Sequence, residues 1–580
     1  WYANTLSGPI THAVNAASNL LSLGGNVASV LAHNPTAIGT ATSAIYRGFV
    51  QGGREARSIL GTGVSKAASV KMESQGPLEL MQDSDLKGAG KILKHWRYVG
   101  RMLSATDQLF YAPAKEVKAA VLARGLAKRE GLKGQRLAAR VREILGNDTA
   151  AKQLAKAQAT TEGLTGLAYA RRVDQIMEAQ RPETIREDAH EFALLTTFNG
   201  TPYGLLGAIA DGFNMIHRKA VVTRMVVPFV NVVANVTNET LNYSPVGFGR
   251  AAWAHWNVRT KGQGRIHGRD ITSLDTVHDA YAKASLGLLA TGALLALAAA
   301  GAGDDDYWFA ISGAGPVTPD QRKALRATGW IPHSLRIGKR YWSYANTPLA
   351  VPLAIVGNYL DALKYRKLEE TDILNRVAFA VGTAGNVVVQ QSYLDNVAQL
   401  LGSLDHVSAR SADQRAVDVV SRSVTTLAIP QALRQIDRVF DPAMTEPGTV
   451  VERVVAQIPF ARRNLKPALN SLGEPVVLSP ASRFTSAEKG DEIWTVLSAK
   501  QAWPSVPDQG YFTPEEHYSL VELRGTLLKG ALVGALPRIA AAPPDEAKRI
   551  VSSLSGEATL RAKATLGLDR VERLRKLEAP

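Results

Sequence analysis

The sequence contains no cysteine and few aromatic residues. Among 580 residues there is no Cys, and Phe, Trp and Tyr together make up 7%. The lack of cysteine excludes disulfides, thiolate zinc sites, iron–sulfur clusters and thiol catalysis. A composition that is 46% hydrophobic, rich in Ala and Gly but poor in aromatic residues, favours close-packed helices over a β-sandwich. We therefore predict a mostly α-helical, elongated protein of several units. One small β-hairpin is expected over residues 337–344, where Gly338-Lys339 lies between two short β-prone runs.

Catalytic signatures are also missing. His190-Glu191 lacks the second histidine of a metalloprotease helix, and Gly88-Ala89-Gly90-Lys91 lacks the spacing of a phosphate-binding loop. No GxSxG motif occurs. We therefore expect no enzyme activity, cofactor or metal in this segment, although a lytic or polymerase domain elsewhere in a longer chain is compatible with the sequence. The first residue is Trp1 rather than Met, which predicts a processed product or part of a longer chain.

Acidic residues are outnumbered by basic ones. Lys and Arg number 67 against 52 Asp and Glu, a formal net charge of +15. This balance favours an anionic partner, either nucleic acid or an anionic membrane surface. Charge is distributed unevenly, and its distribution divides the chain into five segments. They are a helical opening that starts with a charge-free stretch (1–86), a basic helical region (87–190), a helical region with a basic, Trp-containing part (191–283), a hydrophobic helix with a hairpin and uncharged helices (284–410), and Pro/Gly-broken helices ending in an amphipathic helix (411–580).

The opening of the chain carries no charged side chain. Residues 1–46 contain no Asp, Glu, Lys or Arg, and their apolar residues recur at helical spacing. Gly24-Gly25 and Asn34-Pro35 predict breaks that divide this stretch into short helices. Two interpretations stay open: a helical hairpin buried inside an assembly, and a membrane-active segment.

Two regions are strongly basic. Residues 87–143 carry 14 Lys or Arg against 4 Asp or Glu, and residues 250–269 carry five Arg or Lys, no acid, and Trp253 and Trp256. Solvated helix faces or surface loops explain such residues, and so does a surface for phosphate contact, base stacking or the membrane interface. The candidates for contact with DNA or an anionic surface are Lys87, Lys91, Lys94, Arg97, Arg101, Arg124, Lys128, Arg129, Lys133, Arg136, Arg250, Arg259, Lys261 and Arg265.

One stretch is long and apolar enough to cross a membrane. Residues 284–303 have no charge over 20 positions, with Lys283 before them and three Asp after them. At ~1.5 Å per residue they span ~30 Å as a helix. A fully buried bundle helix is the alternative. The residues predicted to insert are Leu286, Leu288, Leu289, Leu294, Leu295 and Leu297.

Three other stretches have a helical or uncharged pattern. Pro348 and Pro352 argue against a single membrane helix over the uncharged residues 341–360. Residues 377–394 form a further uncharged stretch. The last 25 residues predict one amphipathic helix, with apolar positions at Leu560, Leu566, Leu574 and Leu577.

Several short motifs recur in one order along the chain. Residues 4–15 read NTLSGPITHAVN; Arg101, Leu103, Ala105, Asp107 and Phe110 follow an RxLxAxDxxF pattern; Pro228-Phe229, Asn235 and Ser244-Pro245 follow. Then come a GxGP sequence at 313–316 and GWIPHS at 329–334. Together they resemble the motifs of the internal virion, or ejection, proteins of short-tailed bacteriophages and of the related large polyvalent phage proteins. The resemblance rests mainly on Asn4, Ser7, Gly8, Pro9, Thr11, His12, Asn15, Asp107, Gly315, Pro316, Gly329, Trp330 and Pro332.

This resemblance implies a core protein stacked near the portal in the virion. Such proteins leave at infection and help to form a channel across the host envelope for genome delivery. The implied partners are copies of the chain itself in a ring or bundle around the portal axis, other core proteins and the portal, double-stranded DNA bound without base specificity, and the host inner membrane. The implied location is the capsid interior, then the host envelope. The alternatives are a DNA-binding structural protein that never enters a membrane, and a carrier segment of a polyvalent phage toxin or enzyme.

Overall fold

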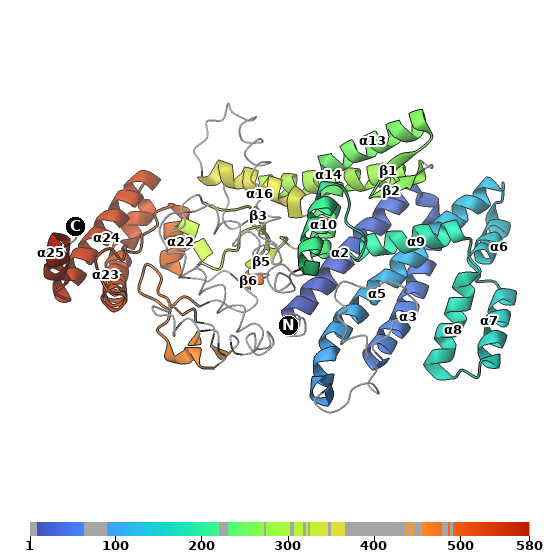
Figure 1. Cartoon of the computed structure of the whole chain (residues 1–580). Coiled ribbons are helices and arrows are strands. Elements are labelled where there is room, and N and C mark those ends of the chain that lie inside the picture. The colour runs from blue at the N-terminus through green and yellow to red at the C-terminus, as the bar shows by residue number, and fades with distance from the viewer. Residues whose placement is uncertain are drawn as a thin grey trace. The chain divides into compact units, whose positions relative to one another are not determined.

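The computed structural model describes residues 9–62, 90–219, 230–271, 274–301, 307–316, 328–345, 350–365, 460–477 and 491–578, with short pieces between 321 and 326, between 437 and 458, and at 485–487. Helices account for 73% of the interpretable residues, so the predicted mostly α-helical fold is confirmed (Figure 1). The chain forms two compact units. Unit 1 contains residues 1–292, 346–352 and 388–407, and unit 2 contains residues 293–345, 353–387 and 408–580.

The core of unit 1 is built from four helices. They are α2 (Pro9–His33), α3 (Ile38–Thr62), α5 (Gly90–Arg129) and α9 (Glu183–Thr196). Small residues let these helices approach closely. Their buried positions are largely Ala and Val, such as Val30, Ala44, Val117, Ala120 and Ala193. The Ala-rich composition therefore serves helix–helix packing, as the sequence predicted.

One of the two predicted breaks in the opening segment is wrong. Helix α2 runs without interruption through Gly24-Gly25. Gly25 has a packing role instead, because a Cβ there would collide with the Tyr243 ring. The break at Asn34-Pro35 is present, since a short 3-10 turn (η1, Pro35–Ala37) separates α2 from α3. The opening is therefore a pair of long helices.

In the described part of unit 1, the other elements are helices and one hairpin. Helices α6 (Gly134–Ile144), α7 (Thr149–Thr161) and α8 (Gly166–Ala179) precede α9, and α10 (Gly204–Lys219) and α12 (Val230–Asn242) follow it. Helix α13 (Pro245–Lys261) is capped by the Ser244 side chain and ends at left-handed Gly262.

A two-stranded hairpin that the sequence did not predict joins α13 to the next helix. Strands β1 (Gly264–Ile266) and β2 (Arg269–Ile271) pair antiparallel and lead into α14 (Asp275–Ala300). The turn between them consists of His267 and Gly268, both with positive φ (51° and 81°), which is the conformation that a two-residue hairpin turn requires. Figure 1 shows α13 and α14 as neighbours connected through this hairpin.

Unit 2 contains a four-stranded antiparallel sheet in the order β3-β4-β5-β6. The strands are β3 (Phe309–Ser312), β4 (Ser334–Ile337), β5 (Arg340–Ser343) and β6 (Thr485–Ala487). The predicted hairpin is confirmed: β4 and β5 pair across a Gly338-Lys339 turn. Helix α16 (Ala350–Tyr365) begins after the predicted Pro348 interruption, so 341–360 does not form one straight helix.

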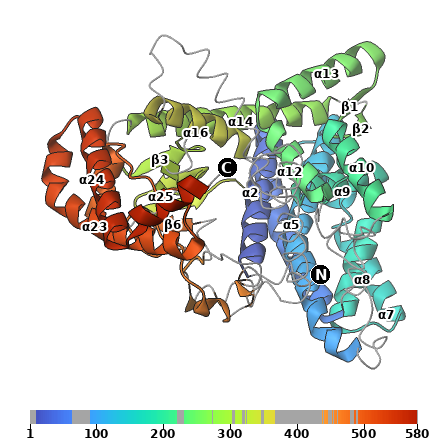
Figure 2. The ribbon, with the colours of Figure 1, turned by 60° about the vertical axis from the view of Figure 1, so that its left-hand side comes forward.

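The C-terminal part of unit 2 is a helical bundle (Figure 2). It contains α22 (Glu492–Ala499), α23 (Pro514–Ala541), α24 (Pro544–Thr565) and α25 (Leu568–Glu578), and a short 3-10 turn, η3 (Arg462–Asn464), precedes it. Helix α23 begins with a capping box between Thr513 and Glu516.

The prediction of one amphipathic helix at the C-terminus is wrong. The chain breaks at Leu566-Gly567, where Gly567 has a φ of 68°. Leu560 is 66% exposed. The buried face of α24 is instead made by small residues, among them Ala547, Ala558 and Ala562.

Several sequence predictions fall outside the described residues. They concern Lys87, the uncharged stretch 377–394, and the motif residues Asn4, Ser7 and Gly8.

Candidate functional site

Two of the motif residues meet at a buried carboxylate in unit 1. Asp107 on α5 is 5% exposed and accepts hydrogen bonds at 2.9 Å from the amides of Asn15 and Asn19 on α2. A third amide, from Asn199, lies at 3.3 Å. Burial raises the pKa of Asp107 to about 6 although these amides favour the charged form. Pro9, Thr11 and His12, which carry the same motif as Asn15, form the first turn of α2.

A third motif residue braces the loop that supplies Asn199. Asn235 on α12 donates hydrogen bonds to the carbonyls of Phe198 (3.1 Å) and Gly200 (2.5 Å). Phe198 has a φ of 58°, a conformation that a bulky residue adopts only when its surroundings impose it. The motifs at Asn15, Asp107 and Asn235 therefore specify one connected polar core.

A second polar cluster surrounds a buried ion pair. Lys283 on α14 and Glu239 on α12 lie 2.8 Å apart, with side chains 6% and 3% exposed. Asn26 and Asn242 donate further hydrogen bonds to Glu239. Burial would raise the pKa of Glu239, but the Lys283 ammonium and these hydrogen bonds outweigh it, and the pKa is lowered.

Three more side chains complete this second cluster. Arg250 donates to Asn238 and Asn242 and lies over the ring of Tyr203. The Tyr203 hydroxyl is 3.1 Å from Nδ1 of His267. Burial lowers the pKa of His267 to about 3, so its imidazole is neutral at physiological pH. Arg250, predicted as a contact to DNA, is thus engaged in internal contacts.

In unit 2 the GxGP sequence wraps a carboxylate. The backbone N–H groups of Gly313 and Gly315 donate to Asp361 on α16 at 2.9 and 2.7 Å. Burial raises the pKa of Asp361 to about 7 despite these two hydrogen bonds. Gly315 has a φ of 79° and packs on Trp330, so any side chain at this position would strike the indole.

The other motif residues of unit 2 belong to the same structure. Gly329 has a φ of 94°, Pro316 is buried and Pro332 is half-buried. His333 beside Pro332 is 1% exposed, and burial lowers its pKa to about 4. These residues fix a loop conformation, which is a structural role.

The predicted basic residues divide into three groups. Arg101 is 1% exposed and contacts the Leu60 and Gly61 carbonyls, so its assignment to a DNA-contacting surface is corrected: its guanidinium is internal. Lys91, Lys94 and Arg97 lie in the first turns of α5. The exposed members are Lys128, Arg129, Lys133, Arg136, Arg259, Lys261 and Arg265, and Arg124 is half-buried.

Some exposed cations already have partners. Arg129 pairs with Asp275 at 2.7 Å, and Lys128 donates to Thr36 at 2.6 Å. Within the described residues no ion pair engages Lys133, which immediately precedes α6, or Arg136, which lies in its first turn. These two are the strongest remaining candidates for phosphate contact.

Helix α13 presents an aromatic face to solvent. Trp253 and Trp256 are 67% and 63% exposed, and one helical turn separates them. The opposite face packs on α14 and β1 through Ala251 and Ala254. Arg259 and Lys261 are exposed at the C-terminal end of the same helix. Helix α13 therefore exposes both indole rings and positively charged side chains.

Helix α14 is the one helix, in the part of the chain that the structure describes, that is long and apolar enough to cross a membrane, judged by length and composition. Only 22% of its most apolar window is buried. Among the leucines predicted to insert, Leu289 is 70% and Leu288 is 40% exposed. The others, Leu286, Leu294, Leu295 and Leu297, are half-buried. Most of this apolar window is therefore left uncovered by the single chain.

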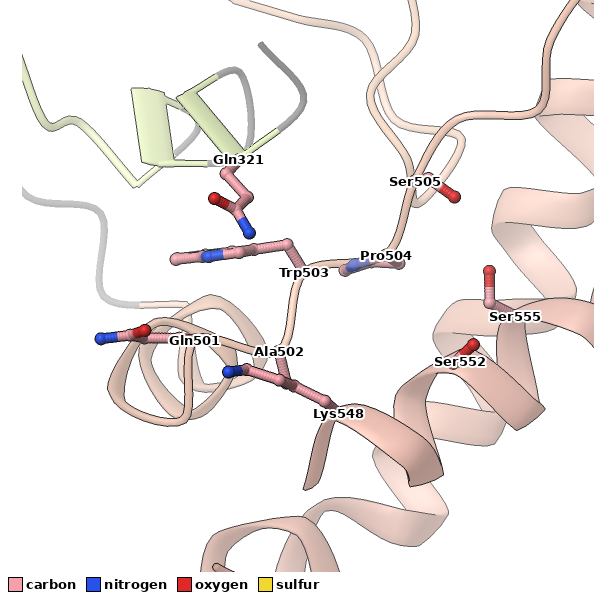
Figure 3. A pocket seen from close by; sticks show the side chains of 9 residues that line it. All are labelled: Gln321, Gln501, Ala502, Trp503, Pro504, Ser505, Lys548, Ser552 and Ser555. Carbon is pink, nitrogen blue, oxygen red and sulfur yellow. The ribbon is translucent and has the colours of Figure 1, made fainter. Parts of the chain in front are cut away.

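A hollow of about 310 Å³ lies in unit 2, and Figure 3 shows the side chains that line it. Gln321 lies over the Trp503 ring, and Ser552 and Ser555 lie on α24. Ser555 accepts a hydrogen bond from the buried Arg524. Among the described residues that line this hollow there is neither histidine nor carboxylate, and Lys548 is its ionisable side chain.

Sequence reasoning missed several residues of these clusters. Asn19, Asn26, Glu239 and Asp361 carry no recognisable spacing, because their partners lie far away in the sequence. A carboxylate or amide inside an otherwise apolar helical stripe was the available signal, since such groups are buried only with hydrogen-bond partners.

No family model, curated protein or solved structure matches the chain.

Proposed function

We propose that this chain is an internal core protein of a short-tailed bacteriophage, released at infection to help form a trans-envelope channel for genome delivery. The observation that carries the proposal is α14, an apolar helix of which only 22% of the most apolar window is buried and on which Leu288 and Leu289 are exposed. Leaving such leucines in water costs free energy that a lipid or protein environment recovers. The motif resemblance supplies the virion context.

The exposed face of α13 supports the membrane part of this proposal. Tryptophan is favoured at the boundary between hydrocarbon and lipid headgroups, and basic residues are attracted to anionic lipid. Trp253, Trp256, Arg259 and Lys261 combine both features. Helix α13 adjoins α14 through the pairs Phe248–Tyr281 and His255–His278, so the two elements are positioned to meet the same membrane.

The proposal is tested by release of dye from vesicles that contain anionic lipid. The Leu294→Asp variant places a charge at the centre of the apolar stretch, which opposes insertion by ~2.5–3.5 kcal/mol. Leu289→Asp changes a side chain that is 70% exposed, so the folded state tolerates it. Leu560→Asp on α24, 66% exposed, is the matched control.

We expect the parent and Leu560→Asp to release dye and both α14 variants to be strongly impaired. Release by Leu289→Asp at the parent rate would rule out α14 as the inserting element. A parent chain that leaves vesicles intact but binds duplex DNA would favour the second candidate, a structural DNA-binding protein of the capsid interior. Lys133, Arg136 and the other exposed cations are the observation that supports this second candidate.

A further inference from the structure

Two imidazoles and a carboxylate converge where the end of α2 meets the start of α14. The ligand atoms of His33, Asp275 and His278 all lie within 4.8 Å of one another. The rings of His33 and His278 have centroids 4.9 Å apart. Asp275 and His278 are one turn apart on α14 and therefore share a face. Because His33 comes from a distant part of the sequence, no local spacing motif reveals this cluster.

The side chains match the requirements of a borderline transition metal. Two imidazole nitrogens and one carboxylate oxygen form a recurrent zinc ligand set, in which water occupies the fourth position. Ligand atoms at about 2.0–2.1 Å from a tetrahedral zinc lie roughly 3.4 Å apart, so small side-chain rotations close the present spacing. A single carboxylate with two imidazoles suits Mg²⁺ and Ca²⁺ poorly, because both prefer oxygen ligands.

The surroundings leave the cluster accessible. All three residues are partly exposed, and an open hollow of about 510 Å³ lies beside them, lined by His33, His278, Tyr281 and Leu289 among others. Arg129 pairs with Asp275 at 2.7 Å, but these side chains are 67% and 44% exposed. An ion pair in such a position is weak and easily displaced, so Arg129 competes with a metal ion without excluding it.

We propose that His33, Asp275 and His278 form a binding site for zinc or a similar transition metal ion that ties the end of α2 to the first turn of α14. The expectation of no metal from the sequence rested on ligand motifs with short spacings, which His33 and the two α14 residues do not form. A metal that binds only the folded chain stabilises it by mass action. The site does not depend on the proposed role in genome delivery.

The test is calorimetric titration of the full chain, freed of metal by a chelator, with zinc chloride. We expect one zinc ion per chain and a higher thermal unfolding midpoint with zinc present. His33→Asn and His278→Asn should each weaken zinc binding at least tenfold. Arg129→Gln should strengthen it several-fold, because it removes a competing cation from Asp275. Cobalt chloride should give the visible absorption of a low-symmetry, mixed nitrogen–oxygen site.

The matched control is His255→Asn. The His255 ring lies 6.3 Å from that of His278 but does not belong to the ligand set, so its loss should leave the zinc affinity unchanged. The unfolding midpoint of each variant without zinc shows whether it folds. The absence of zinc binding in the parent, equal binding in the parent and both histidine variants, or an equal response to magnesium chloride would each overturn the proposal.

Discussion

Asp107 shows how one buried carboxyl group links distant parts of the chain. It lies on α5, yet its hydrogen-bond partners Asn15, Asn19 and Asn199 come from α2 and from the loop after α9. Burial raises the pKa of Asp107 from 3.8 to about 6. The proton therefore binds the folded chain more tightly than the unfolded chain, which makes the stability of unit 1 depend on pH.

We predict that the Asp107→Asn variant loses part of the pH dependence of the free energy of unfolding. With the folded pKa above the unfolded one, the stabilisation is fully present below about pH 4 and is lost as the pH rises through about 6. A pKa shift of this size corresponds to a change of about 3 kcal/mol in the free energy of unfolding. Urea unfolding of the parent over this pH range should show that decline, and Asp107→Asn should lack it. Asp211→Asn, which alters an exposed carboxylate, should keep the parent's slope, and an unchanged slope in Asp107→Asn would contradict the prediction.

The Lys283–Glu239 pair allows a second test at the same scale. Removing one member of a buried ion pair leaves an uncompensated charge and costs about 3–5 kcal/mol, whereas removing both costs much less. We expect Lys283→Met to lower the free energy of unfolding by that amount, and Lys283→Met with Glu239→Gln to recover part of it. Arg172→Met breaks an exposed pair with Glu162 and should leave the unfolding midpoint unchanged. Equal losses in the single and double variants would show that the pair contributes little.

Single residues show which features of the site could be predicted from the sequence. Asn15 and Asp107 were identified through their motifs, but their direct contact depends on how α2 packs on α5. Arg101 was assigned to a surface because it is basic, yet tertiary packing buries it. Charge alone indicates a surface only on average, so local patterns identified the chemistry but not the partners.

At the scale of elements, α3 and α5 depend on glycine for their close approach. A Cβ at Gly48 would lie 2.7 Å from the Pro113 nitrogen and 2.9 Å from the Ala112 carbonyl oxygen. These are backbone atoms that cannot rotate away. A Cβ at Gly53, on the same helix, would meet no atom within 4 Å. The two glycines therefore have different roles in one helix.

We predict opposite effects for alanine at these two positions. Gly48→Ala should destabilise the chain by about 1–3 kcal/mol, because it forces α3 away from α5. Gly53→Ala should stabilise it by about 0.5–1 kcal/mol through a higher helix propensity and a less flexible unfolded chain. Chemical unfolding monitored by circular dichroism measures both changes. A stabilising Gly48→Ala would mean that the helices do not meet at this point.

Elements were predicted well where the signal was local. The Gly338-Lys339 hairpin, the Asn34-Pro35 break and the long apolar helix α14 were read from turn chemistry and periodicity. The sequence did not predict that α2 continues through Gly24-Gly25, because contacts such as that of Gly25 with Tyr243 outweigh the low helix propensity of glycine. The β1–β2 hairpin was missed because its turn contains His267, a residue not typical of such turns.

At the scale of the whole molecule, the positive charge predicts binding to duplex DNA without base preference. The affinity should fall steeply with salt concentration. In a plot of the logarithm of the binding constant against the logarithm of the salt concentration, each phosphate contact contributes a slope of about −0.9. We expect Lys133→Gln and Arg136→Gln each to reduce that slope by about one contact. Arg140→Gln removes an equal charge, but Arg140 already pairs with Glu130 and Glu143, so the slope should stay unchanged. Anisotropy titrations on two unrelated duplexes check this, and salt-independent binding or a strong preference for one duplex would contradict it.

The last prediction concerns self-association, which the resemblance implies and a channel requires. One side of α3 leaves a row of apolar side chains in contact with solvent: Ile38, Tyr46, Phe49, Val50 and Leu60 are between 37% and 72% exposed. Exposed apolar side chains gathered on one helix favour a partner interface, and rotational symmetry lets identical faces from several copies be covered together around an axis.

We therefore expect the purified chain to form a ring or bundle, with a mass by light scattering several times the 62.2 kDa of one chain. Tyr46→Glu with Val50→Glu places charges in the middle of the exposed row and should release monomers. Leu154→Glu on α7, at a leucine that is 53% exposed, should leave the assembly intact. A monomeric parent chain would contradict the prediction. It would also weaken the channel proposal, because that proposal needs several copies around an axis to enclose a passage for DNA.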